Sequence, residues 1–312
     1  MLLQKGILWQ RLTATTESAL RCGALVPVPT GSVFIEDSSV RFFVRVLSSL
    51  RRKDEARKKQ DAEVKEGKAA NPFLPPEKEL TVCDVTDTHV AVLNKFNVVD
   101  HHLLIVTRHF EDQDTLLTLG DFEALWCCMA EYNSLGFYNG GREAGASQQH
   151  KHLQLVPLPL APEGPAVPIE PLLAAADGRN RPCVVPAFPF LHAFVRLEKD
   201  LWKAPLEAAK KTFRLYSEML SSLGMDIPPA SGLRPQSGPY CFLATREWML
   251  LVPRTKEFFE DISFNSLAFA GSFFVRNEAQ LERLQKYGPL NALRLTAKDR
   301  DNDKWGDEEV RK

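Results

Sequence analysis

Ser147-Gln148-Gln149-His150-Lys151-His152-Leu153-Gln154 is the stretch of this sequence that says most about the fold. If it forms an extended strand, its side chains alternate between the two faces of a sheet. The two histidines and Gln154 then share one face, whereas Lys151 and Leu153 share the other with the following Leu155. The apolar face can pack on a core, so the face with two imidazoles and a carboxamide is predicted to line a site.

These side chains suit phosphoryl transfer. A neutral imidazole is a nucleophile near pH 7 and can form a phosphoramidate with phosphorus. The amide of Gln154 can donate to a phosphate oxygen. The preceding segment Gly140–Ser147 is rich in small residues, which let backbone N–H groups approach a phosphate closely. Two alternatives stay open, because His-x-His is common on surfaces and the pattern also resembles part of a metal site.

The run Gly145–Gln154 resembles the histidine-triad signature in its transferase form, in which glutamine replaces the third histidine. Two further stretches match the same family, Asn94–Arg108 upstream and Thr245–Arg254 downstream. Together they resemble the diadenosine tetraphosphate phosphorylase family, also called ATP adenylyltransferases. The resemblance implies an α+β, histidine-triad-like fold with two related halves, each an antiparallel half-barrel sheet backed by helices. Residues 1–165 would form the catalytic half, and residues 166–312 the C-terminal ATP adenylyltransferase half.

The resemblance also implies roles for single residues. His152 corresponds to the nucleophile, and Gln154 would bind the α-phosphate and stabilise the charge that develops there. His150 is expected to orient the site, either by fixing the tautomer of His152 or by contacting a phosphate. The predicted substrate-binding residues are Asn94, Lys95, Asn139, Gly145, Ala146, Ser147, Gln148, Gln149, Thr245, Arg246, Arg254 and Lys256. For the last four, surface charge or capping is an equal alternative.

The implied reaction is reversible phosphorolysis of diadenosine tetraphosphate to ATP and ADP through an adenylyl-histidine. One alternative is an enzyme that resembles hexose-1-phosphate uridylyltransferases. Against it, the chain lacks the Cys-x-x-Cys pair of their zinc site and has Lys151, not proline, between the histidines. The other alternative is a non-catalytic protein that binds adenine nucleotides as a sensor. His101 and His102 point to opposite strand faces and are predicted to be structural, as is His192.

Composition limits the other function classes. The chain has 312 residues, 25% of them charged, and a net charge of −1, so it has no global field that would attract nucleic acid or membranes. No apolar run reaches the ~18–20 residues that a membrane span requires. The six cysteines are scattered, which favours free thiols and a cytoplasmic location.

The predicted partners are small molecules: diadenosine tetraphosphate, ATP, ADP and phosphate. We expect no metal site and no tightly bound cofactor, although magnesium or manganese could arrive with the polyphosphate. The charge run Arg51–Lys68 is either a solvated helix or linker, or a segment from which one lysine near its start reaches a polyphosphate. The sequence leaves the oligomeric state open.

Hydrophobic periodicity predicts helices and strands along the whole chain. Helices are expected at Leu8–Cys22, Asp121–Leu135, Leu206–Leu223, Asn277–Tyr287 and Leu290–Leu295. Strands are expected at Phe34–Glu36, Val40–Val46, Leu80–Asp84, Val90–Lys95, Leu103–Thr107, His150–Val156, Phe190–Leu197, Tyr240–Thr245 and Trp248–Pro253. Gly136 would follow the end of the second helix.

Overall fold

The computed structural model of the protein describes residues 3–47, 71–225 and 235–300. The charge run Arg51–Lys68 lies outside these residues. The centre of the fold is an eight-stranded sheet in the order β3-β4-β5-β7-β6-β9-β10-β8, in which every pair of neighbours is antiparallel. Its strands are β3 (Thr81–Asp84), β4 (His89–Leu93), β5 (Leu103–Thr107), β6 (Ser134–Gly140), β7 (His152–Pro157), β8 (Ala193–Arg196), β9 (Tyr240–Ala244) and β10 (Trp248–Pro253).

Smaller elements surround this sheet. A three-stranded sheet contains β1 (Thr30–Asp37), β2 (Val40–Leu47) and β13 (Ser272–Val275), with β13 parallel to β2. A short hairpin joins β11 (Phe258–Phe259) to β12 (Ile262–Ser263). The helices are α1 (Leu8–Cys22), α3 (Leu119–Met129), α4 (Glu170–Leu173), α5 (Pro205–Ser222), α6 (Ser266–Phe269), α7 (Glu278–Tyr287) and α8 (Pro289–Arg294).

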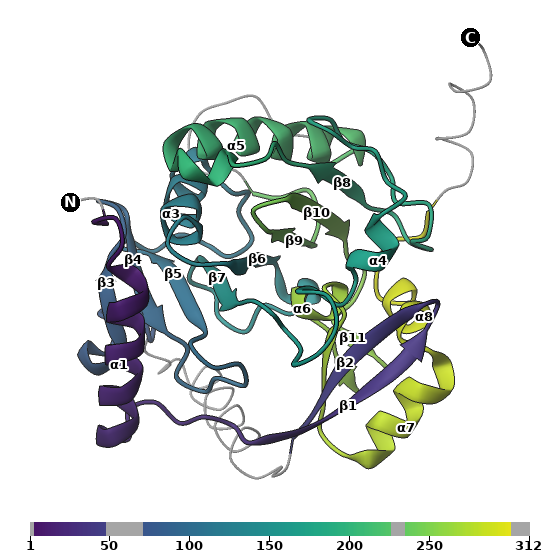
Figure 1. Ribbon diagram of the computed structural model, residues 1–312, viewed down its shortest axis with the longest axis horizontal. Helices are drawn as coiled ribbons and strands as arrows, with labels where there is room; N and C mark the ends of the chain where they lie inside the picture. The colour runs from purple at the N-terminus through teal and green to yellow at the C-terminus, as the bar shows by residue number, and fades with distance from the viewer. Residues whose placement is uncertain (1–2, 48–70, 226–234, 301–312) are drawn as a thin grey trace.

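An apolar core lies against each face of the central sheet. Figure 1 shows α1, α3 and α5 along one side of this sheet and the three-stranded sheet with α7 and α8 away from them, at the lower right. On one face, α1, α3 and α5 pack over residues that include Leu153 and Leu155 of β7. On the other face, the three-stranded sheet and α6–α8 enclose a second core that includes Phe137 and Val156. The alternation predicted for the histidine strand is therefore confirmed, because the side of β7 that carries Leu153 and Leu155 faces the helices.

The fold contains the same order of elements twice. The first copy is β5-α3-β6-β7 and the second is β8-α5-β9-β10. The two copies meet where β6 pairs with β9, so their strands appear in mirrored order across the sheet. The α+β fold with an antiparallel central sheet is as predicted. The expected division near residue 165 falls between β7 and α4, while the central sheet continues across both halves.

One predicted helix was wrong at its C-terminal end. The helix expected at Asp121–Leu135 starts earlier, with Thr118 and Asp121 forming a reciprocal cap, and ends at Met129. Gly136 does not follow the helix but lies inside β6, a strand that the sequence did not predict. A Cβ atom there would lie 2.7 Å from Leu125 Cδ1, so glycine allows α3 to pack closely on β6. The other predicted helices and strands all occur in the described residues, but the strands predicted to start at His150 and Phe190 start later, at His152 and Ala193.

Candidate functional site

The two histidines of the motif lie side by side. His152 is the first residue of β7, and His150 precedes the strand but forms an isolated bridge with Asp112. The Phe73 ring lies 5.6 Å from each imidazole, measured between ring centroids. Both side chains are buried, with His152 4% exposed. The prediction that they share one face is confirmed.

His152 is held in one tautomer by the backbone. Its Nδ1 lies 2.8 Å from the carbonyl oxygen of His150. Because a carbonyl oxygen can only accept, Nδ1 carries the hydrogen, and Nε2 keeps its lone pair. Burial lowers the pKa of His152 to about 4. The imidazole is thus neutral at physiological pH and has a nucleophilic nitrogen that is not used in this contact.

The ring of His150 has a different environment. Its Nε2 donates to the carbonyl oxygen of Thr107 at 2.7 Å, and its Nδ1 lies 2.8 Å from the amide nitrogen of Asn71. Burial lowers the pKa of His150 as well. Both ring nitrogens therefore bind protein groups, and the group of His150 that contacts His152 is its backbone carbonyl. The orienting role expected of His150 remains a prediction, with this carbonyl as the atom that would carry it.

Gln154 is oriented by a histidine that we expected to be structural. The Nε2 of His102 donates to Gln154 Oε1 at 2.9 Å, and Asn94 Nδ2 lies 3.2 Å from His102 Nδ1. With its oxygen engaged, Gln154 has its amide nitrogen as the remaining donor. Asn94 thus reaches the site through His102. His101 points the other way, against Trp9 and Thr16 of α1, so only His102 departs from the expectation.

The small-residue loop between β6 and β7 is folded on itself at its start. The N–H groups of Ala144, Gly145 and Ala146 donate to the carbonyls of Gly141 and Arg142. Gly145 has φ +91°, and a Cβ atom there would lie 2.8 Å from Asn265, so this turn requires glycine. In the described part of the chain, the N–H groups of the next three residues have no hydrogen-bond partner. These residues are Ser147, Gln148 and Gln149.

The remaining predicted residues of the first half serve other contacts. Asn139 Oδ1 accepts from the backbone N–H and the hydroxyl of Ser266, at 3.0 and 2.7 Å. Lys95 Nζ lies 2.7 Å from Glu77 Oε1 in a partly exposed ion pair. Asn139 is therefore fixed under the loop, and Lys95 is held near the surface.

Two of the four predicted second-half residues lie away from His152. Thr245 and Arg246 lie at the β9–β10 turn, directly after Ala244. Ala244 pairs with Gly136 near the start of β6, whereas the small-residue loop follows the other end of β6, at Gly140. Arg246 stacks over Trp202 at 3.9 Å and lines a separate cavity of about 850 Å³ with Thr245.

Arg254 is close to the loop but buried beneath it. All three of its guanidinium nitrogens donate inside the protein, to the carbonyls of Thr296, Phe264, Lys256 and Glu257 and to Cys241 Sγ. The Sγ of Cys241 in turn contacts the carbonyl of Ala144. This contact set gives Arg254 a structural role and leaves no guanidinium nitrogen for a phosphate. The Lys256 side chain is exposed.

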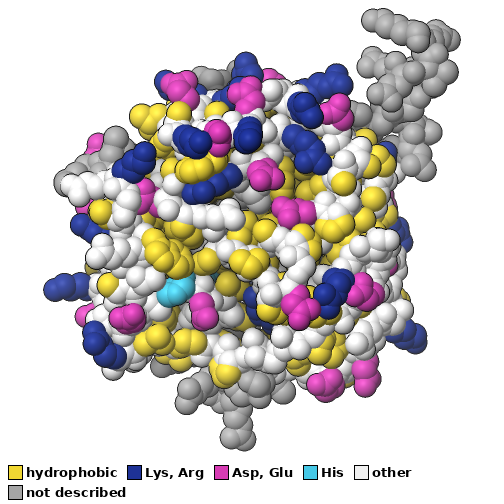
Figure 2. Space-filling view, in the orientation of Figure 1, with side chains coloured by type: hydrophobic (Ala, Val, Ile, Leu, Met, Phe, Trp, Pro, Cys, Tyr) yellow, Lys and Arg dark blue, Asp and Glu magenta, His cyan; other side chains and the backbone are white. Residues whose placement is uncertain are grey.

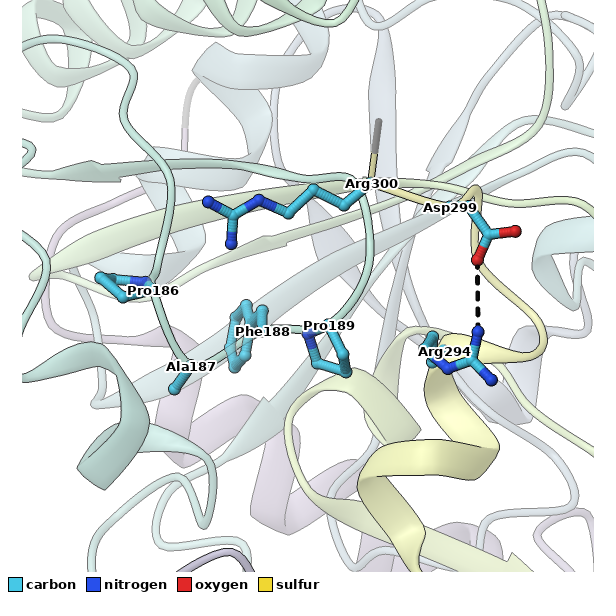
Figure 3. A pocket seen from close by; sticks show the side chains of 7 residues that line it. All are labelled: Pro186, Ala187, Phe188, Pro189, Arg294, Asp299 and Arg300. Carbon is cyan, nitrogen blue, oxygen red and sulfur yellow. Dashed lines mark hydrogen bonds and ion pairs between the residues drawn. The ribbon is translucent and has the colours of Figure 1, made fainter. Parts of the chain in front are cut away.

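Another cavity, of about 470 Å³, lies far along the chain from the motif (Figure 3). Its lining residues include Phe188, Pro189, Arg294 and Arg300. The guanidinium of Arg294 pairs with Asp299 at 3.5 Å. None of its lining residues is among the predicted site residues. The neighbouring His192 is buried, as expected of a structural histidine. Its Nδ1 donates to the Phe190 carbonyl and its Nε2 accepts from the Val185 N–H.

Lys151 makes a buried ion network on the side of β7 that faces α3. Its fully buried ammonium lies 2.7 Å from Asp121 Oδ2 and 3.2 Å from Glu111 Oε2. His89 Nε2 donates to the other oxygen of Asp121. Burial would raise the pKa of Asp121, but Lys151 and His89 outweigh it and hold that pKa well below its usual range. The network fixes the residue between the two histidines to the start of α3.

Sequence patterns missed three contributors to the site: Asn71, Phe73 and Gln113. Gln113 is buried, and its carboxamide binds the backbone of His152 at 2.8 Å. It lies in the acidic stretch Glu111–Asp114, which is typical of a surface loop, so no local signal marks it. In the part of the chain that the structure describes, no group of three or more His, Cys, Asp or Glu side chains could hold a metal ion.

Comparison with known proteins places the chain in a family. Residues 1–175 match the family model of the Ap4A (diadenosine tetraphosphate) phosphorylase N-terminal domain, and residues 186–298 match the ATP adenylyltransferase C-terminal domain. Diadenosine tetraphosphate phosphorylase 2 of Saccharomyces cerevisiae is 26% identical over 274 residues, which cover 79% of this chain and 80% of the relative. Protein APA1 of the same yeast is 25% identical over 296 residues, 86% of each chain.

Solved structures agree with this family at the level of the fold. The crystal structure of yeast Ap4A phosphorylase Apa2 superposes with a TM-score of 0.76 at 21% identity, over 97% of both chains. The structure of Apa2 in complex with Ap4A gives a TM-score of 0.75 at 22% identity, over 96% of this chain and 99% of that one. Because the N-terminal family model alone covers more than half of the sequence, this chain belongs to the Ap4A phosphorylase family.

Proposed function

We propose that this protein phosphorolyses Ap4A to ATP and ADP through a covalent adenylyl-histidine on His152. The observation that carries the proposal is the tautomer of His152. The His150 carbonyl holds Nδ1–H at 2.8 Å, which leaves the Nε2 lone pair for attack on phosphorus. The family relatives support the same substrate, since Apa2 has been crystallised with Ap4A.

In the first step, His152 Nε2 attacks the α-phosphorus of Ap4A. The nitrogen–phosphorus bond forms while the bond from that phosphorus to the bridging oxygen breaks, and ATP leaves with this oxygen. The ring becomes positively charged, and its Nδ1–H continues to donate to the His150 carbonyl. That contact stabilises the charged ring without moving a proton.

We expect two groups to stabilise the charge on the phosphate oxygens. Gln154 presents its amide nitrogen because His102 occupies its oxygen. We expect the N–H groups of Ser147, Gln148 and Gln149, which have no hydrogen-bond partner among the described residues, to bind phosphate oxygens at the end of the loop. Their contacts with substrate remain predictions that follow from these orientations.

In the second step, an oxygen of inorganic phosphate attacks the adenylyl phosphorus. The phosphorus–nitrogen bond breaks, ADP leaves, and His152 regains its lone pair. Gln154 does not titrate, so it cannot act as a general base for water at this position. We therefore expect transfer to phosphate to dominate over hydrolysis.

The expected partners are small molecules. Charges of both signs are interspersed on the face shown in Figure 2, and the net charge of the chain is −1. None of the described helices is both long enough and apolar enough to span a membrane. All six cysteines are free, which supports a reducing, cytoplasmic location. If magnesium or manganese is required, we expect the polyphosphate oxygens to hold it.

Product analysis tests the proposal. The protein is incubated with Ap4A, with and without phosphate, and the nucleotides are separated by ion-exchange chromatography. We expect equal amounts of ATP and ADP, little AMP, and turnover only when phosphate is present. ATP and AMP at a rate that does not depend on phosphate would instead make the protein a hydrolase. Binding without turnover would make it a nucleotide sensor, and uridylyl transfer to a hexose phosphate would indicate the other transferase class.

A further inference from the structure

The pairing between β6 and β7 stops just before the nucleophile. The two strands pair from Ser134 opposite Pro157 to Phe137 opposite Gln154. Continued in the same register, the pairing would place Asn139 opposite His152. This pair is absent from the described ladder, although both residues are buried and their backbone groups require partners.

The carboxamide of Gln113 takes the place of the missing pair. Its Oε1 accepts from the backbone N–H of His152 at 2.8 Å, and its Nε2 donates to the Asn139 carbonyl at 2.9 Å. The same Nε2 lies 3.3 Å from the His152 carbonyl. These contacts form the Gln113 bridge, which keeps the two strands apart at the catalytic end and still satisfies their backbone groups.

The Gln113 bridge is itself fixed from behind. The backbone N–H of Gln113 donates to the Gln149 carbonyl at 2.7 Å, and the hydroxyl of Tyr138 donates to the Gln113 carbonyl at 2.5 Å. Two residues earlier, the Glu111 carbonyl accepts from the N–H of Lys151 at 2.8 Å. The short segment 111–113 therefore holds the backbone on both sides of His150, whose carbonyl sets the tautomer of His152.

We propose that Gln113 is a positioning residue for adenylyl transfer, an inference that rests on the proposed function. The Nδ1–H contact of His152 depends on the relative placement of two backbone segments, at residues 150 and 152. The Gln113 bridge fixes one of them directly and the other through the segment 111–113. Without it, β7 can move towards β6, and a displacement of about 1 Å at a nucleophile can cost about 100-fold in rate.

The first test compares two buried glutamines. Gln280 is also almost fully buried, and its carboxamide accepts from the Arg276 N–H at 2.8 Å and donates to the Asp261 carbonyl at 3.0 Å, within the α7 region. Gln113→Met and Gln280→Met thus remove the same kind of contact. In single-turnover adenylyl transfer, we expect the rate constant of Gln113→Met to fall at least about 100-fold, with little change in the half-saturating Ap4A concentration.

Gln280→Met should keep the rate of the unmodified protein. If both variants lose the same activity, or if Gln113→Met changes only the half-saturating concentration, the positioning role is overturned. Gln113→Asn is a milder change, because it keeps the amide and shortens the bridge by one methylene. It provides the same comparison if the methionine variant does not fold, and an unchanged rate in it would equally contradict the inference.

A second readout does not depend on activity. NMR of protein labelled with ¹⁵N in histidine reports which ring nitrogen carries the hydrogen, and His152→Ala assigns the signals. We expect the Nδ1–H tautomer in the unmodified protein and a mixture of both tautomers in Gln113→Met. If the unmodified protein is inactive but Gln113→Met changes the tautomer, the proposed function is overturned, whereas the positioning of His152 by Gln113 stands. If the unmodified protein is active but the His152 tautomer is the same in Gln113→Met, the positioning role is overturned, whereas the proposed function stands.

Discussion

The burial of His152 predicts an unusual pH dependence for adenylyl transfer. Its pKa is lowered to about 4, whereas an ordinary histidine has a pKa of about 6.5. At pH 5.0, about 90% of imidazoles with the lower pKa are neutral, against only about 3% with the ordinary one. On lowering the pH from 7.5 to 5.0, we therefore expect this ionisation to lower the rate constant of adenylyl transfer by about 10%, and not by about 30-fold.

The quantity to measure is kcat/KM for Ap4A, which reports ionisations of the free enzyme. In a two-step transfer it depends on the first half-reaction, so the ionisation of the phosphate acceptor does not enter. Rapid-quench measurement of adenylyl-protein formation without phosphate gives the same constant directly. A fall of about 30-fold centred near pH 6.5, with the fold intact, would refute the burial argument.

The fold must be monitored in the same samples. The folded pKa values of His152 and His192, both about 4, lie below the unfolded value of about 6.5. The unfolded chain thus binds more protons, and stability decreases as the pH falls through this window. Circular dichroism at each pH, and full recovery of activity at pH 7.5, separate this effect from protonation of the nucleophile.

Three further predictions concern the strand and its support. Gln154→Leu should slow phosphorolysis about 100- to 1,000-fold by removing one donor to the developing charge, whereas Gln154→His should raise the share of AMP among the products, as chromatography can show. Lys151→Met should lower the free energy of unfolding in urea by about 3–5 kcal/mol because it removes the ammonium partner of the buried Asp121 carboxylate. Lys151→Met combined with Asp121→Asn should recover part of that loss, and a Lys151→Met variant within about 1 kcal/mol of the unmodified protein would contradict the network. Gly136→Ala should lower the free energy of unfolding by about 1–3 kcal/mol in the same assay, because the new methyl group would clash with Leu125. An unchanged midpoint would show that α3 can move away from β6 without loss of stability.

The local sequence pattern was sufficient to predict the histidine strand β7. Alternation alone separates the faces of β7, because the side-chain period of a strand does not depend on its neighbours. The same reasoning failed for β6, whose sequence Ser-Leu-Gly-Phe-Tyr-Asn-Gly carries two glycines that are typical of turns. Its strand conformation is imposed by pairing with β7 on one side and β9 on the other.

Residues that support the site from a distance could not be predicted in this way. Gln113 and His102 act on His152 and Gln154 only because the sheet brings together segments that are far apart in the chain. Arg254 shows the opposite error, since a cation after a strand resembles a phosphate ligand. Its partners are carbonyls that the fold supplies from residues as distant as Thr296. The spacing of residues in the sequence predicts neither these supporting contacts nor the carbonyl partners of Arg254.

The most direct test of the account is to trap the adenylyl-enzyme and locate it. Labelled Ap4A and the protein are mixed without phosphate under single-turnover conditions, and the adduct is mapped by peptide mass spectrometry. We predict an acid-labile, base-stable adduct on His152 that is absent from His152→Ala. His192→Ala is the matched control, because His192 has the same Nδ1–H contact to a carbonyl but its Nε2 already accepts from the Val185 N–H. An adduct on any other residue, or none while Ap4A is consumed, would contradict the account.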